Sequence, residues 1–277
     1  MNPHVRPACS PLSMMQSLLR HRSLIIQMIR RDVAGRYKGS MAGVLWSFVN
    51  PLCLLITYTF VFSVVFKARW GGGGEVGGRS EFAMFLFTGM IVYGLFSESI
   101  VRAPGLIVGN VNYVKKIVFP LEILPVVSIG TSLFHTAVSA VVLCGAVLFL
   151  QGSVPWTLVL LPLVLLPLVI LAVGLSWLLA SLGVFIRDVS QPIGLVMTAM
   201  LFASPVFYPV SAVPEGFRSL FLLNPLTFII DQSRQVVLLG QQPDWLGMSI
   251  YLCVAFAVSW GGYVWFQRTR KGFANVL

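Results

Sequence analysis

The sequence predicts an all-α integral membrane protein with six transmembrane helices, an N-terminal amphipathic interface helix and an outer re-entrant helical hairpin. Hydrophobic residues make up 57% of the 277 residues and charged residues only 10%, where a soluble domain carries about 25% charged residues. The mean hydropathy is +0.88. So few charges cannot cover a water-soluble surface, and several apolar runs are long enough to cross a bilayer.

The predicted spans follow from the apolar runs, since a helix needs about 20 predominantly apolar residues to cross a bilayer. The six runs are 43–66, 82–101, 126–150, 158–186, 192–208 and 246–266. The second contains Glu98, and the run at 192–208 is uncharged but short. We expect one transmembrane domain over 43–266, preceded by an N-terminal segment at 1–42 and followed by a tail at 267–277.

The orientation follows from the distribution of positive charge. The chain has 19 Lys and Arg residues against 9 Asp and Glu residues, and an inside N-terminus leaves only five of the 19 outside. These five are Lys67, Arg69, Arg79, Arg218 and Arg234. Membrane proteins concentrate Lys and Arg in cytoplasmic loops, so both termini are expected in the cytoplasm. No basic stripe interleaves with stacking aromatics outside the spans, which disfavours nucleic acid as a partner.

Residues 14–38 have the pattern of an amphipathic helix. Apolar side chains recur there at helical spacing: Leu19, Ile26, Ile29, Val33 and Tyr37. Such a helix suits a membrane surface, with arginines directed toward lipid phosphates. The alternative is a plain positively charged flank of the first span. Glycines four residues apart lead into that span and predict a face open to close helix approach: Gly35, Gly39 and Gly43.

Two segments between the spans are informative. The inner link 102–122 mixes Pro, Gly and Asn with basic residues, and 103–114 could form a short helix that docks a partner, or a solvated loop. On the outer side, the apolar stretches 217–223 and 226–239 are both too short to cross a bilayer. They predict two half-helices that dip back from the outer face, because irregular backbone at membrane depth must be surrounded by protein or water.

Several function classes lack their motifs here. The glycine-rich stretch at 72–77 matches a dinucleotide fingerprint in letters only, because no strand precedes it. No P-loop occurs, so this chain does not hydrolyse ATP by that route. The 4 cysteines and 3 histidines show no metal-ligand spacing, and we expect neither cofactor nor metal on this chain.

Intramembrane charge is the usual mark of ion-coupled transport. The predicted spans contain Glu98, near a membrane boundary, and His135, which we expect to be hydrogen-bonded in a helix contact. No facing carboxylate pair or His/Asp relay is evident. This pattern disfavours a secondary transporter and an intramembrane transferase or hydrolase, both of which remain alternatives, and it indicates an energy source on another chain.

Aromatic residues are concentrated in the first and fifth predicted spans. Most are expected to contact lipid or anchor the interfaces. A subset could line a wide pathway, because aromatic faces offer weak stacking contacts of low specificity. Our candidates for such pathway aromatics are Trp46, Tyr58 and Phe202.

Four separated groups of residues resemble one family. They are Arg30-Arg31-Asp32 with Arg36-Tyr37-Lys38-Gly39-Ser40, Gly43-Val44-Leu45-Trp46 and Asn50-Pro51-Leu52; Val114-Lys115-Lys116-Ile117-Val118-Phe119-Pro120; Ser204-Pro205-Val206-Phe207-Tyr208 with Asn224-Pro225-Leu226; and Gly272-Phe273-Ala274-Asn275-Val276-Leu277. In this order they resemble the ABC-2 type polysaccharide-export permeases, most of all the O-antigen exporters and then the teichoic-acid exporters. Capsule or another cargo is an alternative.

The resemblance implies a homodimer that pairs with two copies of a separate cytoplasmic ATPase, which binds ATP and Mg²⁺. Its cargo would be an undecaprenyl-diphosphate-linked glycan, moved across the bacterial inner membrane. The resemblance further implies three sets of site residues. The interface helix would contact lipid diphosphate through Arg30, Arg31, Arg36, Tyr37 and Lys38. The ATPase would dock on Pro104, Gly105, Asn112, Lys115 and Lys116. The outer gate would comprise Pro205, Phe207, Tyr208, Phe221, Asn224 and Pro225.

Overall fold

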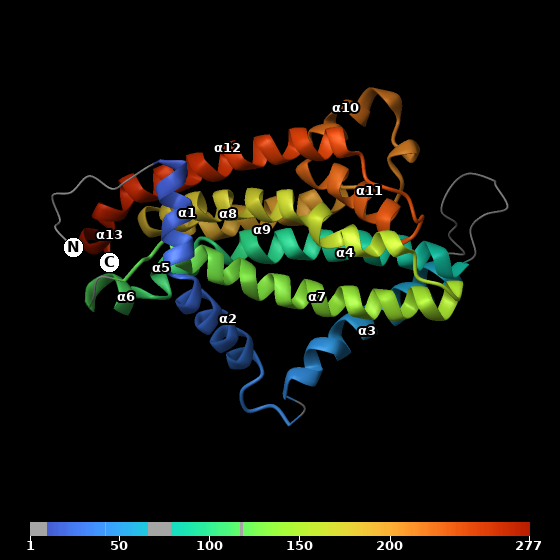
Figure 1. Cartoon of the computed structure of the whole chain (residues 1–277), viewed down its shortest axis with the longest axis horizontal. Helices are drawn as coiled ribbons and strands as arrows, with labels where there is room; N and C mark the ends of the chain where they lie inside the picture. The colour runs from blue at the N-terminus through green and yellow to red at the C-terminus, as the bar shows by residue number, and fades with distance from the viewer. Residues whose placement is uncertain (1–9, 42, 66–78, 117–118) are drawn as a thin grey trace.

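The computed structural model describes residues 10–41, 43–65, 79–116 and 119–277, and every regular element within these ranges is a helix. Within these ranges, four helical segments are long and apolar enough to cross a membrane. The first is Glu81–Arg102 in α4 (Arg79–Arg102), and the others contain α7 (Ile123–Gln151), α8 (Leu161–Phe185, preceded by the 3₁₀ turn η3, Trp156–Leu160) and α12 (Trp245–Thr269). These helices run lengthwise beside one another (Figure 1) and confirm four of the six predicted spans.

The first and fifth predicted spans form shorter helices. After the 3₁₀ turn η1 (Gly43–Leu45), α3 (Trp46–Tyr58) has 13 residues and continues as the π-helical segment η2 (Thr59–Val65). The fifth run overlaps α9 (Ser190–Phe202), also 13 residues long, which follows the 3₁₀ turn η4 (Arg187–Val189). The chain leaves α9 just before Ser204, whose helical conformation is disfavoured by the following Pro205. The count of six spans therefore stays a prediction.

The N-terminal region is two helices rather than the single predicted one. Ser10 caps α1 (Pro11–Arg20) by accepting a hydrogen bond from the Ser13 amide at 3.1 Å. The backbone leaves the helix at His21, and α2 (Arg22–Arg36) then runs in a different direction (Figure 1).

The buried residues of α2 differ in part from the predicted apolar stripe. Ile25, Met28 and Val33 are buried, and α2 packs on α7. Of the predicted apolar stripe, Val33 is inside, whereas Leu19 and Ile26 are 63% and 50% exposed. The buried side chains of α2 thus pack on protein, and contact of its exposed apolar side chains with a membrane surface stays a prediction.

Helices α8 and α12 are in backbone contact through glycines. A Cβ atom on Gly262 would lie 2.1 Å from the carbonyl oxygen of Gly174, and one on Gly174 would lie 2.4 Å from the Cα of Ser259. Close helix approach therefore occurs here. It does not occur at Gly35, Gly39 and Gly43, where a Cβ would meet nothing within 4 Å among the described residues. Gly39 and Gly43 have φ values of +88° and +52° and instead allow the turn between α2 and α3.

One end of the bundle, at the left of Figure 1, carries α1, the short helices α5 (Gly105–Val108) and α6 (Val111–Lys116), and α13 (Phe273–Val276), which follows the 3₁₀ turn η6 (Arg270–Gly272). We call it the terminal end. Its buried Glu122 accepts hydrogen bonds from Ser17 Oγ and Arg270 Nη1, both at 3.0 Å. This carboxylate joins α1, the start of α7 and the C-terminal tail.

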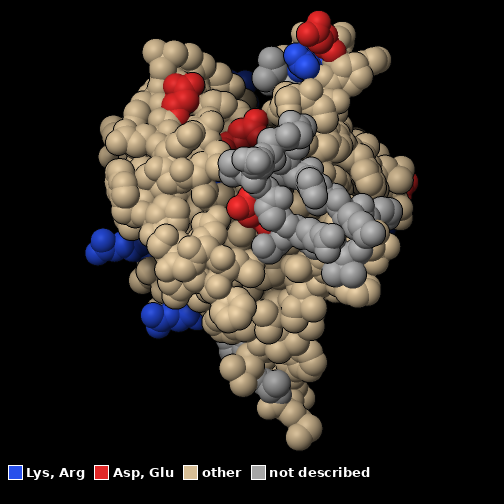
Figure 2. All heavy atoms as spheres, turned by 90° about the vertical axis from the view of Figure 1, so that its right-hand side faces the viewer, with Lys and Arg blue, Asp and Glu red and all other residues tan. Residues whose placement is uncertain are grey.

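The opposite end carries α10 (Glu215–Leu223) and α11 (Pro225–Val237), with the short turn η5 (Val210–Ala212) before them. The two predicted short helices are therefore present, divided at Asn224 as expected; their re-entry into a membrane stays a prediction. Figure 2 faces this end and shows mostly uncharged surface with a few charged side chains.

Candidate functional site

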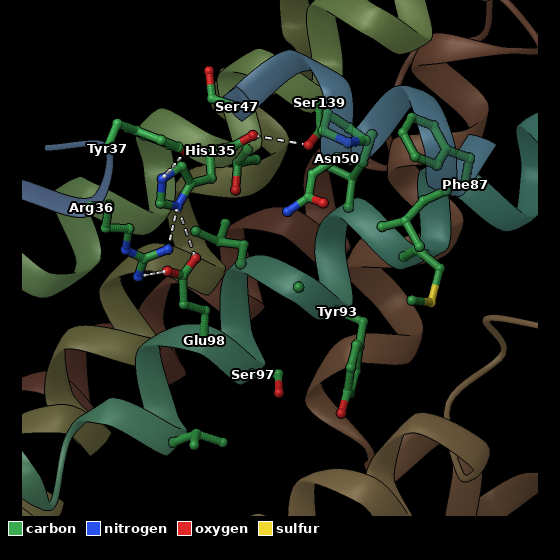
Figure 3. Close-up of a pocket in the computed structure, with 18 residues that line it drawn as sticks. Arg36, Tyr37, Ser47, Asn50, Phe87, Tyr93, Ser97, Glu98, His135 and Ser139 are labelled. Carbon is green, nitrogen blue, oxygen red and sulfur yellow. Dashed lines mark hydrogen bonds and ion pairs between the residues drawn. The ribbon is translucent and has the colours of Figure 1, made fainter. Parts of the chain in front are cut away.

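A pocket of about 510 Å³ lies between the end of α2 and helices α3, α4 and α7 (Figure 3). Polar and apolar residues both line it. The polar lining residues are Arg36, Tyr37, Ser47, Asn50, Tyr93, Ser97, Glu98, His135, Thr136 and Ser139. The volume falls in the range of about 300–1,000 Å³ that is typical of ligand pockets.

Glu98 on α4 is the centre of a polar cluster on one side of this pocket (Figure 3). Its Oε1 accepts a hydrogen bond from Nη2 of Arg36, and its Oε2 lies 3.3 Å from Nδ1 of His135 on α7. The same Nδ1 lies 3.2 Å from Nη1 of Arg36. The hydroxyl of Tyr37 lies 3.4 Å from Nε2 of His135. The cluster therefore joins the end of α2 to both α4 and α7.

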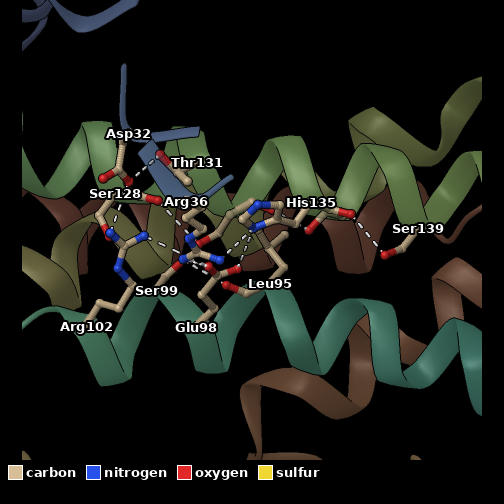
Figure 4. Close-up of polar contacts among 12 residues, drawn as sticks. Asp32, Arg36, Leu95, Glu98, Ser99, Arg102, Ser128, Thr131, His135 and Ser139 are labelled. Atoms are coloured by element: carbon tan, nitrogen blue, oxygen red, sulfur yellow. Dashed lines mark hydrogen bonds and ion pairs between the residues drawn. The ribbon is translucent and has the colours of Figure 1, made fainter. Parts of the chain in front are cut away.

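A second ion pair extends the cluster along α4 (Figure 4). Arg102 donates from Nη2 to Oδ2 of Asp32 at 3.0 Å, and Thr131 Oγ1 donates to the same oxygen at 2.9 Å. Nη1 of Arg102 lies 3.9 Å from Oε1 of Glu98. Two carboxylates and two guanidinium groups thus balance in charge where α2 crosses α4 and α7.

Sequence reasoning missed this cluster. The expectation that His135 is hydrogen-bonded in a helix contact is confirmed. The search for a facing carboxylate pair or a His/Asp relay did not reveal its partner, which is the carboxylate of Glu98. The two residues are 37 positions apart and no local spacing connects them. Because ionisable residues inside membrane spans usually pair with one another, the presence of both Glu98 and His135 in apolar spans could have indicated their contact.

The predicted interface-helix residues divide into two groups. Arg36 and Tyr37 lie in the pocket wall, and Arg36 is already paired with Glu98. Arg30, Arg31 and Lys38 are exposed and form no ion pair with any residue that the structure describes. Guanidinium forks in this state are available to phosphate groups.

The candidate pathway aromatics are brought together in part. The rings of Tyr58, Phe62, Phe207 and Phe202 form a continuous run, with successive centroids 6.5, 6.3 and 5.7 Å apart. It links the π-helical end of the first predicted span to the turn after α9. Trp46 is outside this run, at the other end of α3, and is 49% exposed.

The predicted outer-gate residues converge on the turn after α9. Asn224 caps α11 by accepting from the Leu226 amide at 2.9 Å, and its Nδ2 donates to the Ala203 carbonyl at 3.0 Å and to Ser204 Oγ at 2.8 Å. The Tyr208 hydroxyl donates to the Phe202 carbonyl, and its ring lies edge-on to Phe221 at 6.0 Å.

Two further predicted gate residues, Pro205 and Pro225, and the nearby Arg234 are held by burial or by hydrogen bonds. Pro205 is buried, and the Pro225 carbonyl accepts a hydrogen bond from the Tyr251 hydroxyl at 2.9 Å. Arg234, one of the five charges predicted on the outside, is buried and donates to the carbonyls of Phe85 at 3.0 Å and Val206 at 2.9 Å. Its hydrogen bond to Phe85 connects α11 to α4.

The predicted docking residues lie at the terminal end. Pro104 is buried against α8, because a Cβ on Gly183 would lie 2.1 Å from its carbonyl oxygen. Gly105, Asn112 and Lys115 are exposed. Lys116 ends α6, and its side chain lies outside the described part of the structure. The expected helix over 103–114 is instead the pair α5 and α6, anchored on α8 and open to solvent on the far side.

Comparisons with known proteins agree with this architecture. Residues 23–238 match the family model described as ABC-2 type transporter. The chain is 27% identical over 268 residues to the O-antigen export system permease protein RfbA of Myxococcus xanthus, covering 96% of this chain and all of that protein. It is also 27% identical over 257 residues to RfbA of Klebsiella pneumoniae, covering 92% of this chain and 95% of that protein.

A more distant relative is named for another polysaccharide. The polysialic acid transport protein KpsM of Escherichia coli is 23% identical over 253 residues, covering 87% of this chain and 91% of that protein. The family match covers well over half of the chain, and its helices are apolar and long enough to lie in a membrane. The chain therefore belongs to the ABC-2 type transporter family and is a membrane-embedded permease.

Proposed function

We propose that this chain is the membrane subunit of an ATP-driven exporter that moves an undecaprenyl-diphosphate-linked polysaccharide, an O-antigen, across the bacterial inner membrane. The observation that carries the proposal is the match over nearly the whole chain to permeases named for O-antigen export. The chain itself is a transporter subunit and not an enzyme.

The energy comes from a cytoplasmic ATPase, which binds ATP and Mg²⁺ in two copies beneath a homodimer of this chain. The exposed faces of α5 and α6, with Lys115, form its docking surface. Anchorage of Pro104 against Gly183 supports this role, because a rigid connection to α8 can pass motion of the ATPase to the membrane helices. Both termini lie on the same, cytoplasmic side, as the distribution of Lys and Arg predicts.

The diphosphate of the cargo contacts the interface helix, and its glycan passes along aromatic surfaces. Arg30 and Arg31 are exposed guanidinium groups suited to phosphate. The aromatic run from Tyr58 to Phe202 offers successive faces on which sugar rings can rest without a tight pocket. The turn of Phe207 and Tyr208, with Asn224, forms the gate where the glycan leaves.

Inverted membrane vesicles provide the test. Vesicles containing this chain and its ATPase are loaded from outside with lipid-linked glycan, and protection from an added glycosidase is followed over time. We expect protection to require hydrolysable ATP and to be unchanged by a protonophore. Protection that persists without ATP and disappears with the protonophore would contradict the proposal and indicate a secondary transporter.

A capsule-type polysaccharide is the second candidate cargo, because the chain also resembles a polysialic acid transport protein. Chemical analysis of the glycan that accumulates in cells lacking this chain distinguishes the two cargoes: an isoprenyl diphosphate end supports the main proposal, whereas a chain of sialic acid units supports the capsule-type exporter.

A further inference from the structure

One guanidinium group of the cluster, that of Arg36, is paired with a carboxylate and also exposed to the pocket. Arg36 lines the pocket with 37% of its side chain exposed, more than the 24% of its partner Glu98. It is therefore reachable by a ligand in a pocket of about 510 Å³. Its described anionic partner is Glu98, so an entering anion must compete with that carboxylate.

We propose that Glu98 competes with the diphosphate of the cargo for Arg36. Glu98 pairs with Arg36 when the pocket is empty, and Arg36 pairs with the diphosphate when the cargo enters. The inference rests on the proposed function, since it takes the diphosphate-linked lipid as the ligand. Carboxylate and phosphate both suit the planar fork of a guanidinium group, so the exchange replaces one charge-assisted pair by another.

Glu98 keeps partners after such an exchange. Nη1 of Arg102 is buried, makes no hydrogen bond with the residues that the structure describes, and lies 3.9 Å from Oε1 of Glu98. A small movement of the carboxylate brings it into contact. Glu98 is therefore not left as an uncompensated buried charge, which would be strongly destabilising.

His135 can follow the exchange without changing its charge. Its Nδ1 lies within hydrogen-bond distance of both Arg36 and Glu98. A guanidinium group only donates and a carboxylate only accepts. In a neutral imidazole, Nδ1 either accepts or donates, so it can bond only one of the two groups at a time. With Arg36 on Glu98, Nδ1 accepts from Arg36 and Nε2 donates to Tyr37. With Arg36 on the diphosphate, Nδ1 donates to Glu98 and Nε2 accepts from the Tyr37 hydroxyl.

The exchange accounts for an arginine in this pocket whose charge is neutralised by Glu98. A free guanidinium in the pocket would hold a diphosphate tightly and slow its release. Competition from Glu98 weakens binding and returns the site to its starting state after the cargo leaves. The chemistry recognised is that of a diphosphate, whether joined to an isoprenyl lipid or free in solution.

The test measures binding of farnesyl diphosphate and of inorganic pyrophosphate to the purified full-length chain in detergent micelles. Because Glu98→Gln keeps the shape of the side chain but removes its charge, we expect it to bind farnesyl diphosphate about tenfold more tightly than the wild type. Arg36→Gln should weaken the binding about tenfold or more, with or without Glu98→Gln, because Arg30 and Arg31 alone remain for the diphosphate. The matched control is Glu81→Gln, which removes a carboxylate 17 positions earlier on α4 and should leave the affinity unchanged.

The direction of the change in affinity for farnesyl diphosphate distinguishes the exchange from a role of the Glu98–Arg36 pair in stability alone. Equal or weaker binding by Glu98→Gln, in protein with an unchanged melting temperature, would overturn the exchange. If Glu98→Gln does not fold, Glu98→Asp retains the charge but shortens the reach to Arg36, and we expect a smaller increase in affinity; no increase would overturn the proposal.

The remaining outcomes separate this inference from the proposed function. Farnesyl diphosphate binding by the wild type without tightening in Glu98→Gln would overturn the exchange alone. No farnesyl diphosphate binding by any variant would overturn the exchange together with the diphosphate-linked cargo. Inorganic pyrophosphate binding as tightly as farnesyl diphosphate would overturn the lipid as the source of the anion.

Discussion

Arg234 donates a hydrogen bond from Nε to the carbonyl oxygen of Phe85 at 3.0 Å and thereby joins the hairpin helix α11 to the most buried membrane helix, α4. The same guanidinium donates from Nη2 to the Val206 carbonyl at 2.9 Å. One side chain thus connects α11, α4 and the turn after α9. Gly89 on α4 permits the approach, because a Cβ there would lie 3.0 Å from Nη2 of Arg234.

Arg234→Met is expected to lower the free energy of unfolding by about 3 kcal/mol, because two buried carbonyls lose charge-assisted hydrogen bonds. The measurement is the thermal unfolding midpoint of the purified chain in detergent. Arg218 on α10 also donates to two backbone carbonyls, but it is exposed and water can replace those bonds, so Arg218→Met should lower the midpoint much less. Equal midpoints for the two variants would contradict the connecting role of Arg234.

Gly262→Ala is expected to lower the free energy of unfolding by about 1–3 kcal/mol, because the added methyl group overpacks the contact with α8. Its neighbour Gly261 is a matched control, since a Cβ there meets nothing within 4 Å in the described structure. Gly261→Ala should leave the midpoint of thermal unfolding unchanged or raise it. If both alanine variants behave alike, α8 and α12 are not in backbone contact.

Arg30→Ala combined with Arg31→Ala is expected to reduce export about tenfold or more while the protein remains inserted in the membrane. The reason is that exposed guanidinium groups on α2 attract the phosphates of the cargo. Surface glycan is measured by immunoblot, with the amount of permease in the membrane fraction as the reference. The control pair Arg187→Ala with Lys271→Ala removes exposed charges outside α2, and an equal loss there would remove the case for the interface helix.

Charge reversal in Lys115→Glu with Lys116→Glu is expected to weaken association with the ATPase, because both lysines lie on the helix that forms the proposed docking surface. Co-purification of the ATPase with tagged permease measures the association. Lys271→Glu changes an exposed charge in the turn before α13 and should have little effect. Undiminished co-purification of the double variant would mean that the ATPase docks on another surface.

The long spans could be predicted because their signal is local. Ile123–Gln151 and Trp156–Phe185 are uncharged and apolar over more than a bilayer thickness, so helix and burial in lipid follow from composition alone. The pair α10 and α11 could also be predicted, because Asn224 and Pro225 combine a capping residue with a residue suited to the first helical position.

The polar cluster and the packing of α2 could not be predicted in the same way, because they depend on tertiary contacts. Nothing within ten residues of Glu98 indicates His135. Local spacing also does not show that Ile25 is buried where α2 packs on α7 while Ile26 is exposed. Tyr58 and Phe202 are predicted pathway residues because their spans are rich in aromatic side chains. Their rings belong to one run because Phe62 in η2 contacts Phe207 in the turn after α9.

The central claim is that this chain carries out the export step for a lipid-linked polysaccharide. Its most direct test is deletion of the gene, followed by assay of the glycan on the cell surface and inside the cell. The account predicts loss from the surface with accumulation of lipid-linked glycan inside, and recovery with a plasmid-borne copy. Loss of the glycan from both places would contradict it and indicate a biosynthetic role, and unchanged pools would contradict the polysaccharide as cargo.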